Sequence, residues 1–335
     1  MGSALLPELL ARDFVVTCLV RPKLGARPEE RLGPLSAHPD VRAVAGDIGL
    51  PGCGLGTGER GAFDSVIHAA ADTRLELRGA SDRHEINHQG TVNTIALATS
   101  LGVSEFHYVG TAYVAGTAGL LAEQDAREPV TTGLPRNPYE ASKLAAEQHV
   151  RDWPGKVSIY RPSIVVGRSD DGRTHGLHGI YAVFKAAWRL HATICSGAYR
   201  DGLGRQITRQ TPIPIAPGLA LDQTLNLVPI DWIAKTLAAL IDRPPSGRCY
   251  NLVHEADTQL ASLMQAAFEA LDMHNVIVSD RGGMTLSPAV AAANRAVRAE
   301  LERFRPYLSG GVRFEAANAY EDLAPCWPKP APVDA

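Results

Sequence analysis

The sequence predicts an α/β fold, a doubly wound parallel sheet with helices on both faces, joined to a smaller lobe. Short apolar runs alternate with helical patterns over the first two thirds of the 335 residues, and after Gly167 this regularity gives way to glycine-rich and proline-rich stretches. With 45% hydrophobic and 21% charged residues and a formal net charge of -3, the chain can bury a full core. It has no basic excess that would indicate a nucleic-acid partner.

The predicted strands are short apolar runs bounded by polar or turn residues: 14–20, 41–45, 65–69, 106–109, 157–160 and 248–252. The predicted helices carry apolar residues three or four positions apart: 3–11, 85–100, 139–151, 230–241, 258–271 and 287–304. We expect a first domain over 1–167 that returns at about 225–255, and an interleaved smaller lobe over 168–324. The proline-rich tail over 325–335 is expected to be disordered.

The cysteines and the hydropathy bear on location. Five cysteines are scattered along the chain without a C-x-x-C pair, namely Cys18, Cys53, Cys195, Cys249 and Cys326. This spacing predicts neither a disulfide framework nor a metal site, so a reducing cytoplasm is the expected location. No run of about 18 uncharged apolar residues occurs, so we expect no membrane span. The oligomeric state is left open.

Tyr139 and Lys143 form the most informative pair of residues. Asn137-Pro138 precede them, and because proline is tolerated in the first turn of a helix, the pair is expected to share one helical face. An ammonium ion beside a phenol favours the phenolate and lowers its ordinary pKa of about 10. We therefore expect Tyr139 to donate a proton to a carbonyl group that is being reduced. The alternative is an ordinary surface tyrosine and lysine, and the surrounding motifs decide between the two interpretations.

Thr111 supplies the first part of that context. It follows the predicted strand 106–109, at the carboxyl end where open α/β sheets build their sites. Its hydroxyl could therefore donate to the same carbonyl oxygen as Tyr139.

Two earlier segments complete the context. The strand 65–69 runs into His68-Ala69-Ala70-Ala71, small residues that let a flat ligand approach the backbone closely. Asn87 then opens a helix with an amide that can anchor a water molecule or a backbone carbonyl near Lys143. Each segment is a weak signal alone, but their order and spacing are specific.

These motifs resemble those of the extended short-chain dehydrogenases/reductases over residues 2–255. The segments that carry the resemblance are Gly46-Asp47-Ile48, His68-Ala69-Ala70-Ala71, Asn87-x-x-Gly90-Thr91, Thr111, Tyr139-x-x-x-Lys143 and Arg161-Pro162-Ser163. Within that family, segments 110–116, 161–167 and 227–231 are most similar to the thioester reductase and fatty-acyl reductase branch, which has a male-sterility-type NAD-binding domain. The resemblance implies a Rossmann-like domain that binds a dinucleotide, with a substrate lobe beside it.

The resemblance also implies roles for individual residues. Tyr139 would be the proton donor, Lys143 would bind the nicotinamide ribose and tune Tyr139, Thr111 would polarise the substrate carbonyl, and Asn87 would complete a proton relay. Tyr139 and Lys143 would also touch the cofactor, beside Gly2, Arg21, Asp47, Ile48, His68, Ala69, Ala70, Arg161, Pro162 and Ser163. Asp47 and Ile48 would flank the adenine.

Arg21 indicates which cofactor is used. It follows the predicted strand 14–20, where an acidic residue would accept a hydrogen bond from the ribose 2′-hydroxyl and an arginine accommodates a 2′-phosphate. Lys23 and Arg27 lie close by, so we expect NADPH. The alternative is a solvated basic turn.

The start of the chain departs from the family pattern. Gly2 matches only the last glycine of the glycine-rich turn that cradles a pyrophosphate, and the first strand and two earlier glycines do not precede it. That strand is central in the doubly wound order, so its absence would divide the sheet. We expect a natural protein that extends upstream by about ten residues containing a strand and G-x-x-G.

Taken together, the residues and the resemblance predict an NADPH-dependent reductase that transfers hydride to a carbonyl or thioester carbonyl of an acyl-type substrate. A separate carrier protein or coenzyme A would bring a thioester. One alternative is an NAD(P)-dependent alcohol dehydrogenase, ketoreductase or epimerase-like enzyme of the same family. Another is a noncatalytic dinucleotide-binding scaffold or a truncated, inactive protein.

Overall fold

The computed structural model describes residues 1–23, 25–55, 61–73, 85–130, 132–174, 179–196, 213–215, 222–274, 276–278, 288–302, 305–308, 311–324 and 326–333. The chain divides into two compact units. Unit 1 comprises Met1–Asp171, Val228–Val253 and Val312–Ala331, and unit 2 comprises Gly172–Leu227, His254–Gly311 and Pro332–Ala335.

The main sheet of unit 1 is parallel and has the strand order β11-β6-β4-β3. Its strands are β3 (Ser65–His68), β4 (Glu105–Val109), β6 (Lys156–Pro162) and β11 (Cys249–Leu252). The parallel register sets Val109 opposite Tyr160 and Tyr160 opposite Tyr250. The carboxyl ends of these strands therefore meet at one edge, and the predicted doubly wound parallel sheet is confirmed.

A second parallel sheet in unit 1 pairs β1 (Val16–Val20) with β2 (Val41–Ala45). Within the described residues no pairing joins β1 to β3. All five residues of β1 are only half-buried, whereas all four of β11 are buried. Both sheets nevertheless share one core, because Val16 of β1 and Ile67 of β3 pack against the same apolar cluster.

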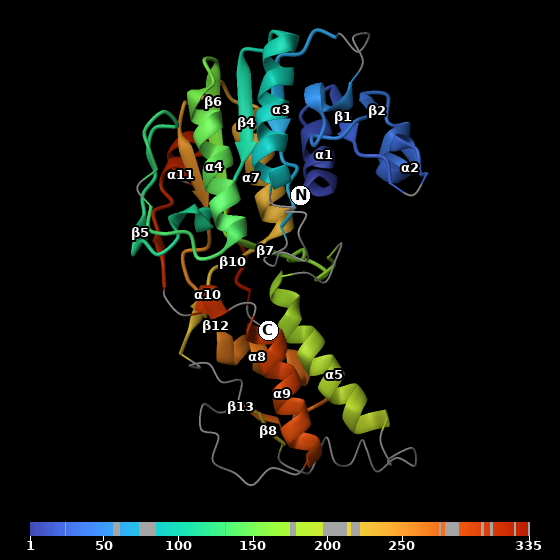
Figure 1. The fold of residues 1–335 in the computed structure, drawn as a ribbon, viewed down its shortest axis with the longest axis vertical. Helices are drawn as coiled ribbons and strands as arrows, with labels where there is room; N and C mark the ends of the chain where they lie inside the picture. The colour runs from blue at the N-terminus through green and yellow to red at the C-terminus, as the bar shows by residue number, and fades with distance from the viewer. Residues whose placement is uncertain are drawn as a thin grey trace. The chain divides into compact units, whose positions relative to one another are not determined.

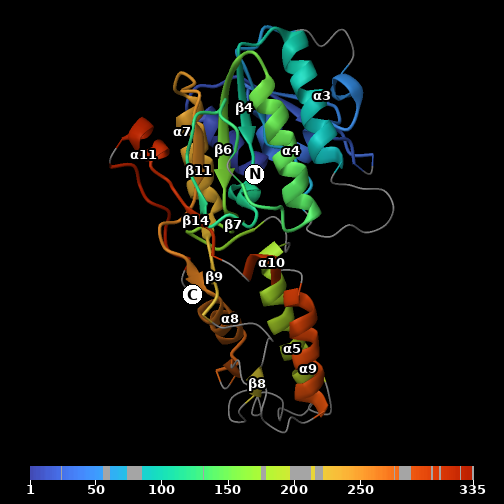
Figure 2. The same cartoon turned by 60° about the vertical axis from the view of Figure 1, so that its left-hand side comes forward.

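Helices cover both faces of the main sheet, as Figures 1 and 2 show. The helices of unit 1 are α1 (Gly2–Leu10), α2 (Pro28–Leu32), α3 (Glu85–Leu101), α4 (Pro138–Asp152), α7 (Ile230–Ile241) and α11 (Asn318–Leu323). Helices α1 and α7 pack on one face through Leu5, Ile233 and Leu237. On the other face Ala98 of α3 and Ala146 of α4 pack against the aromatic residues of β4.

Short elements complete unit 1. They are the 3-10 turns η1 (Gly33–Ala37), η2 (Pro51–Gly54) and η3 (Ala112–Ala115), with the paired strands β5 (Leu120–Leu121) and β14 (Arg313–Phe314), and β7 (Ile164–Val166) and β10 (Leu227–Pro229). The tail over 326–333, for which we expect disorder, makes two hydrogen bonds to α7 in the structure. Trp327 Nε1 donates a hydrogen bond to Thr236 Oγ1 (3.1 Å), and Trp232 Nε1 donates to the carbonyl of Pro328 (2.6 Å). The indole groups hold the tail against α7, which its proline content does not reveal.

Unit 2 is mainly helical. Its elements are η4 (Gly179–Tyr181), α5 (Ala182–Ser196), α8 (Leu260–Glu269), α9 (Pro288–Glu302) and α10 (Arg305–Leu308), with the strand pairs β8 (Ile213–Ile215) and β13 (Val276–Val278), and β9 (Thr224–Leu225) and β12 (Thr258–Gln259). None of the helices in the described segments combines the length and the hydropathy that a membrane crossing needs.

The predicted elements are confirmed, with ends that move by a few residues. The helix predicted over 230–241 is α7 with the same bounds, and the strand predicted over 41–45 is β2. The helix predicted over 258–271 is shorter, because Thr258 and Gln259 pair with β9 before α8 begins.

Candidate active site

Helix α4 carries Tyr139 and Lys143 on one face, as the sequence predicts. Asn137 caps the helix, since its Oδ1 accepts a hydrogen bond from the amide of Glu140 (2.9 Å) and leaves Pro138 in the first turn. Tyr139 is half-buried, and Lys143 is 2% exposed. The cap therefore fixes where the helix starts, and with it the direction of both side chains.

Lys143 lies against strand β4. Its Nζ donates a hydrogen bond to the carbonyl of Val109 (3.0 Å) and sits 4.5 Å from the centre of the Tyr108 ring. Burial lowers the pKa of Lys143 to about 7, and the carboxylate of Glu147 acts in the opposite direction. The lysine therefore changes charge near neutral pH.

Thr111 and Tyr139 meet at the carboxyl end of β4. Burial raises the pKa of Tyr139 to about 12, although a hydrogen bond from Thr111 acts to lower it. Our expectation that Lys143 lowers the pKa of this phenol is wrong for the structure, because the ammonium group turns to Val109 and the Tyr108 ring. Tyr139 is consequently a neutral phenol, the form that can donate a proton.

Asn87 links α3 to the start of α4. Its Nδ2 donates to Ser142 Oγ (3.0 Å) and to the carbonyl of Asp72 (2.9 Å), and its Oδ1 accepts from the amide of Asp72 (2.7 Å). Ser142 Oγ in turn donates to the carbonyl of Tyr139 (2.7 Å). The buried amide thus lies at the turn that carries the tyrosine. Its part in a proton relay stays a prediction.

Small residues follow β3 at the same edge of the sheet. Ala69 is half-buried and Ala70 exposed, so their backbone is open to a ligand. His68 points inward instead, where its Nε2 lies 3.0 Å from Thr91 Oγ1. Burial, and then the charge of Lys143, lower the pKa of His68 to about 3, so this ring is neutral and packs inside the protein. Only its backbone is placed to meet a cofactor.

At the end of β6, Ser163 is available to a ligand and Arg161 belongs to a buried ion pair. Ser163 has a buried hydroxyl that makes no hydrogen bond in the described part of the chain, next to Pro162, whose carbonyl lies 3.5 Å from Thr111 Oγ1. Arg161 departs from our expectation of cofactor binding, because its guanidinium is fully buried and bonds to Glu147 Oε1 (2.6 Å) and Oε2 (3.2 Å).

The loop after β2 packs against α3. Asp47 Oδ1 accepts a hydrogen bond from the amide of Gly49 (2.9 Å), which closes a tight turn. The carbonyl of Ile48 accepts from Asn93 Nδ2 (2.7 Å), and its side chain fills the space beside Gly90. Ile48 is therefore held in place by α3, whereas Asp47 is held by the turn that it closes.

Arg21 is exposed at the end of β1. Arg31 of α2 donates a hydrogen bond to its carbonyl, so two guanidinium groups belong to this corner. Arg27 is less available, because its Nε pairs with Glu30 Oε1 (3.0 Å). Sequence reasoning missed Arg31, whose proximity to Arg21 depends on how α2 folds back on β1.

Gly2 begins α1, and a β-carbon added there would meet no atom within 4 Å. The structure therefore shows no steric need for glycine at this position. In the described part of the chain, no three His, Cys, Asp or Glu side chains gather in a way that could hold a metal ion.

The arrangement fits a dinucleotide such as NAD(P). Ser163 follows β6 and has a buried hydroxyl with no partner in the described residues. Ala70 follows β3 and has an exposed backbone, and Thr111 follows β4, so all three lie at the carboxyl edge of the sheet. Such an edge is where open parallel sheets bind their ligands. Fold and site together define a Rossmann-like α/β protein with a candidate dinucleotide site at the carboxyl edge of its main sheet.

Comparisons with known proteins give the family. Residues 1–237 match the male sterility protein family, an NAD-binding family, and the chain belongs to it. A nonribosomal peptide synthetase of Aspergillus flavus is 27% identical over 364 aligned positions, which cover 97% of this chain and 33% of the synthetase. The chain thus spans about a third of that relative. The predicted resemblance to the reductase branch is confirmed.

Solved structures agree with this assignment. The terminal R domain of the myxalamid PKS-NRPS pathway superposes with a TM-score of 0.73 at 22% identity, covering 99% of this chain and 84% of that one. A thiolation-reductase di-domain from an archaeal nonribosomal peptide synthetase gives a TM-score of 0.65 at 14% identity, covering 97% and 70%. At these identities the likeness shows the fold.

Proposed function

We propose that this protein is an NADPH-dependent reductase that converts an acyl thioester to an aldehyde and a free thiol. The observation that carries the proposal is the meeting of Thr111 and Tyr139 at the end of β4, with Lys143 one turn along α4. The two hydroxyl groups can both donate hydrogen bonds to a substrate carbonyl oxygen and stabilise the negative charge that this oxygen gains during reduction.

Each residue of the site has a part in this reaction. NADPH, when bound, supplies the hydride. Thr111 and Tyr139 hydrogen-bond the carbonyl oxygen, and Tyr139 gives it a proton as the carbonyl carbon is reduced. The tetrahedral product then breaks its carbon–sulfur bond, and the departing sulfur takes up the hydroxyl proton. Tyr139 regains its proton from water. Lys143 would hydrogen-bond the nicotinamide ribose, and the free hydroxyl of Ser163 would be available to bind the cofactor.

The charged corner at Arg21 supports NADPH over NADH. Arg21 and Arg31 provide two guanidinium groups in a place where a 2′-phosphate would lie, and a charge-assisted hydrogen bond contributes about 1.5 to 3 kcal/mol. We also propose that the thioester arrives on a carrier protein or coenzyme A, since the relatives named above include a nonribosomal peptide synthetase and the thiolation-reductase di-domain of another. The four cysteines that the structure describes are free thiols, which suits a reducing cytoplasm.

The proposal is tested with an acyl thioester of coenzyme A or of pantetheine, NADPH, and three proteins. The parent should oxidise NADPH and release thiol in equal amounts, Tyr139→Phe should lose at least about 100-fold in kcat, and Lys143→Ala should also lose NADPH affinity. Reduction of simple ketones without thioester reduction would favour the alcohol dehydrogenase or ketoreductase alternative. NADPH binding with no turnover of either substrate would favour the scaffold.

A further inference from the structure

A column of buried charges runs along one face of α4. Lys143, Glu147 and Arg151 are spaced four residues apart, and Arg161 joins them from β6. Their exposures are 2%, 0%, 3% and 0%. Buried charges cost free energy unless they are paired, so each of these groups needs a compensating partner. The sequence shows the spacing, but only the fold brings Arg161 into the column.

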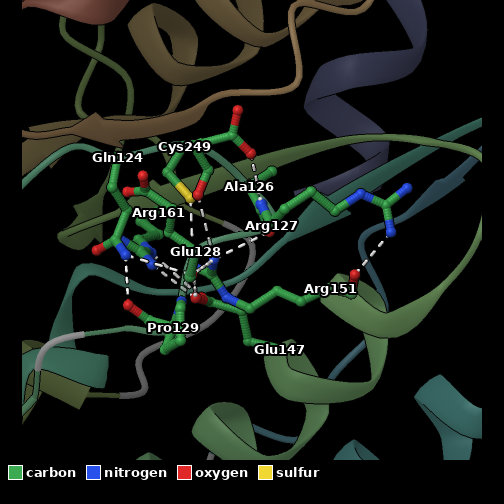
Figure 3. Close-up of polar contacts among 10 residues, drawn as sticks. Gln124, Ala126, Arg127, Glu128, Pro129, Glu147, Arg151, Arg161 and Cys249 are labelled. Carbon is green, nitrogen blue, oxygen red and sulfur yellow. Dashed lines mark hydrogen bonds and ion pairs between the residues drawn. The ribbon is translucent and has the colours of Figure 1, made fainter.

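Glu147 is the anion of this column, as Figure 3 shows. Its Oε1 accepts hydrogen bonds from Arg161 Nη2 (2.6 Å) and Arg151 Nη2 (2.8 Å), and its Oε2 accepts from Arg161 Nε (3.2 Å). Burial alone would raise the pKa of Glu147, but the two guanidinium groups lower it below its usual value. The carboxylate is therefore ionised and fixed in position at neutral pH.

The carboxylate lies beneath the end of β4 that leads to Thr111. A β-carbon built on Gly110 would be 3.3 Å from Glu147 Oε2 and 3.3 Å from Cε1 of Tyr108. Glycine at this position thus leaves room for the ion pair directly behind the site. This contact connects Glu147 to the strand end where the reaction is proposed to occur.

The other titratable groups that face Lys143 carry no charge at neutral pH. His68 of β3 is neutral because burial lowers its pKa to about 3. Tyr108 of β4 and Tyr139 of α4 are neutral phenols because burial raises their pKa values. Among the described groups around Lys143, the opposite charge therefore comes from Glu147, one helical turn away.

We propose that Glu147 is a positioning residue: it is the buried counter-charge that favours the ammonium form of Lys143, and Arg161 and Arg151 hold the carboxylate ionised and in place. The significance for catalysis rests on the proposed function, in which Lys143 binds the cofactor ribose as a cation. The charge of Lys143 itself can be measured without cofactor or substrate.

The parent protein is well placed for such a measurement. Burial lowers the pKa of Lys143 to about 7, so removal of Glu147 changes the charge of this lysine at neutral pH rather than far outside it. The chain contains six lysines, few enough for each to give a resolved NMR signal after labelling with 13Cε-lysine. The signal of Lys143 is assigned by its loss in Lys143→Arg.

The experiment titrates that signal between pH 5 and 11 in cofactor-free protein. Glu147→Gln should lower the midpoint of Lys143 by about one to three pH units, the effect of a close opposite charge. Arg161→Met should move it upward, because the remaining carboxylate is less neutralised. If Glu147 and Arg161 only stabilised the fold, Glu147→Gln and Arg161→Met would not shift the Lys143 midpoint in opposite directions.

Two further variants guard against misfolding. Glu147→Gln leaves two buried arginines without their anion, so the double variant Glu147→Gln/Arg161→Met removes one of these cations together with the anion. It should still show a downward shift, but a smaller one than Glu147→Gln, because a neighbouring positive charge is lost as well. Arg127→Met is the structural control, since Arg127 caps α4 by donating to the carbonyls of Arg151 and Trp153 and does not touch Glu147. It should lower the melting temperature and leave the Lys143 midpoint unchanged.

The proposal is overturned if the Lys143 midpoint stays within about 0.3 pH units of the parent in both variants that lack the carboxylate, or if Arg127→Met moves it as far as they do. Neither outcome depends on turnover. A protein with the expected lysine shifts and no thioester reduction would refute the proposed function while leaving the role of Glu147 intact.

Discussion

The close approach of α3 to the loop after β2 allows a strict test of the packing. A β-carbon built on Gly90 would lie 2.7 Å from Cδ1 of Ile48 and 3.0 Å from its Cγ1. Ile48 has little room to retreat, because its carbonyl accepts the 2.7 Å hydrogen bond from Asn93 on the same helix. Gly90→Ala should therefore force the two elements apart.

Two effects of opposite sign set the magnitude. Alanine is more favourable than glycine in a helix interior by about 1 kcal/mol, whereas overpacking a core contact costs about 1 to 3 kcal/mol. Because the overlap reaches Cγ1 as well as the mobile Cδ1, we expect the steric cost to prevail. The predicted net loss is about 1 kcal/mol of unfolding free energy, or roughly 2 to 4 °C in melting temperature.

The assay is thermal unfolding of four proteins: the parent, Gly90→Ala, Ile48→Ala and the double variant. In the Ile48→Ala background the two closest contacts are gone and only the Cβ of residue 48 remains, at 3.3 Å. Gly90→Ala should therefore be clearly less destabilising there than in the parent, and can stabilise by up to about 1 kcal/mol. Gly2→Ala in α1 is the matched control. No atom lies within 4 Å of the added carbon there, so this variant should not be destabilised.

Equal or higher stability of Gly90→Ala in the parent background would refute the reasoning. So would a double-mutant cycle with no coupling between Gly90 and Ile48. NADPH titration adds a second reading, because displacement of Ile48 should weaken cofactor binding if this side chain flanks the adenine.

Four other predictions follow from the site. The pKa of Lys143 is lowered by burial from 10.5 to about 7, so between these values the unfolded chain binds one more proton, and this lysine makes the unfolding free energy rise with pH. Urea unfolding at pH 7 and 9 should show a smaller rise in Lys143→Met. If the ammonium form binds the ribose, NADPH affinity should fall about tenfold per pH unit above pH 7, and a pH-independent dissociation constant would contradict this. Arg21→Asp should reverse the preference for NADPH over NADH in parallel titrations; equal affinity of the parent for both cofactors would rule out the assignment. Thr111→Val should lower kcat with little change in NADPH affinity, and an unchanged kcat would remove Thr111 from the reaction.

The sequence by itself determined the elements and their order. Alternating apolar runs predicted the parallel strands, and the spacing of Tyr139 and Lys143 put both on one face of α4, because local periodicity encodes which side of a helix or strand is buried. The family motifs predicted which side chains belong to the site.

Only the tertiary structure decided what those side chains do. Arg161 reads in the sequence as a cofactor contact, but its strand places it against Glu147, and the direction of a side chain on a buried strand depends on register rather than on residue type. Burial likewise reversed the expected effect on Tyr139, because the pKa of a phenol depends on its whole surroundings and not on one neighbour four residues away. The charge of Glu147 depends in part on Arg161, which long-range packing brings from β6, and the charge of Lys143 depends on its burial in the folded protein. No local pattern encodes either of these.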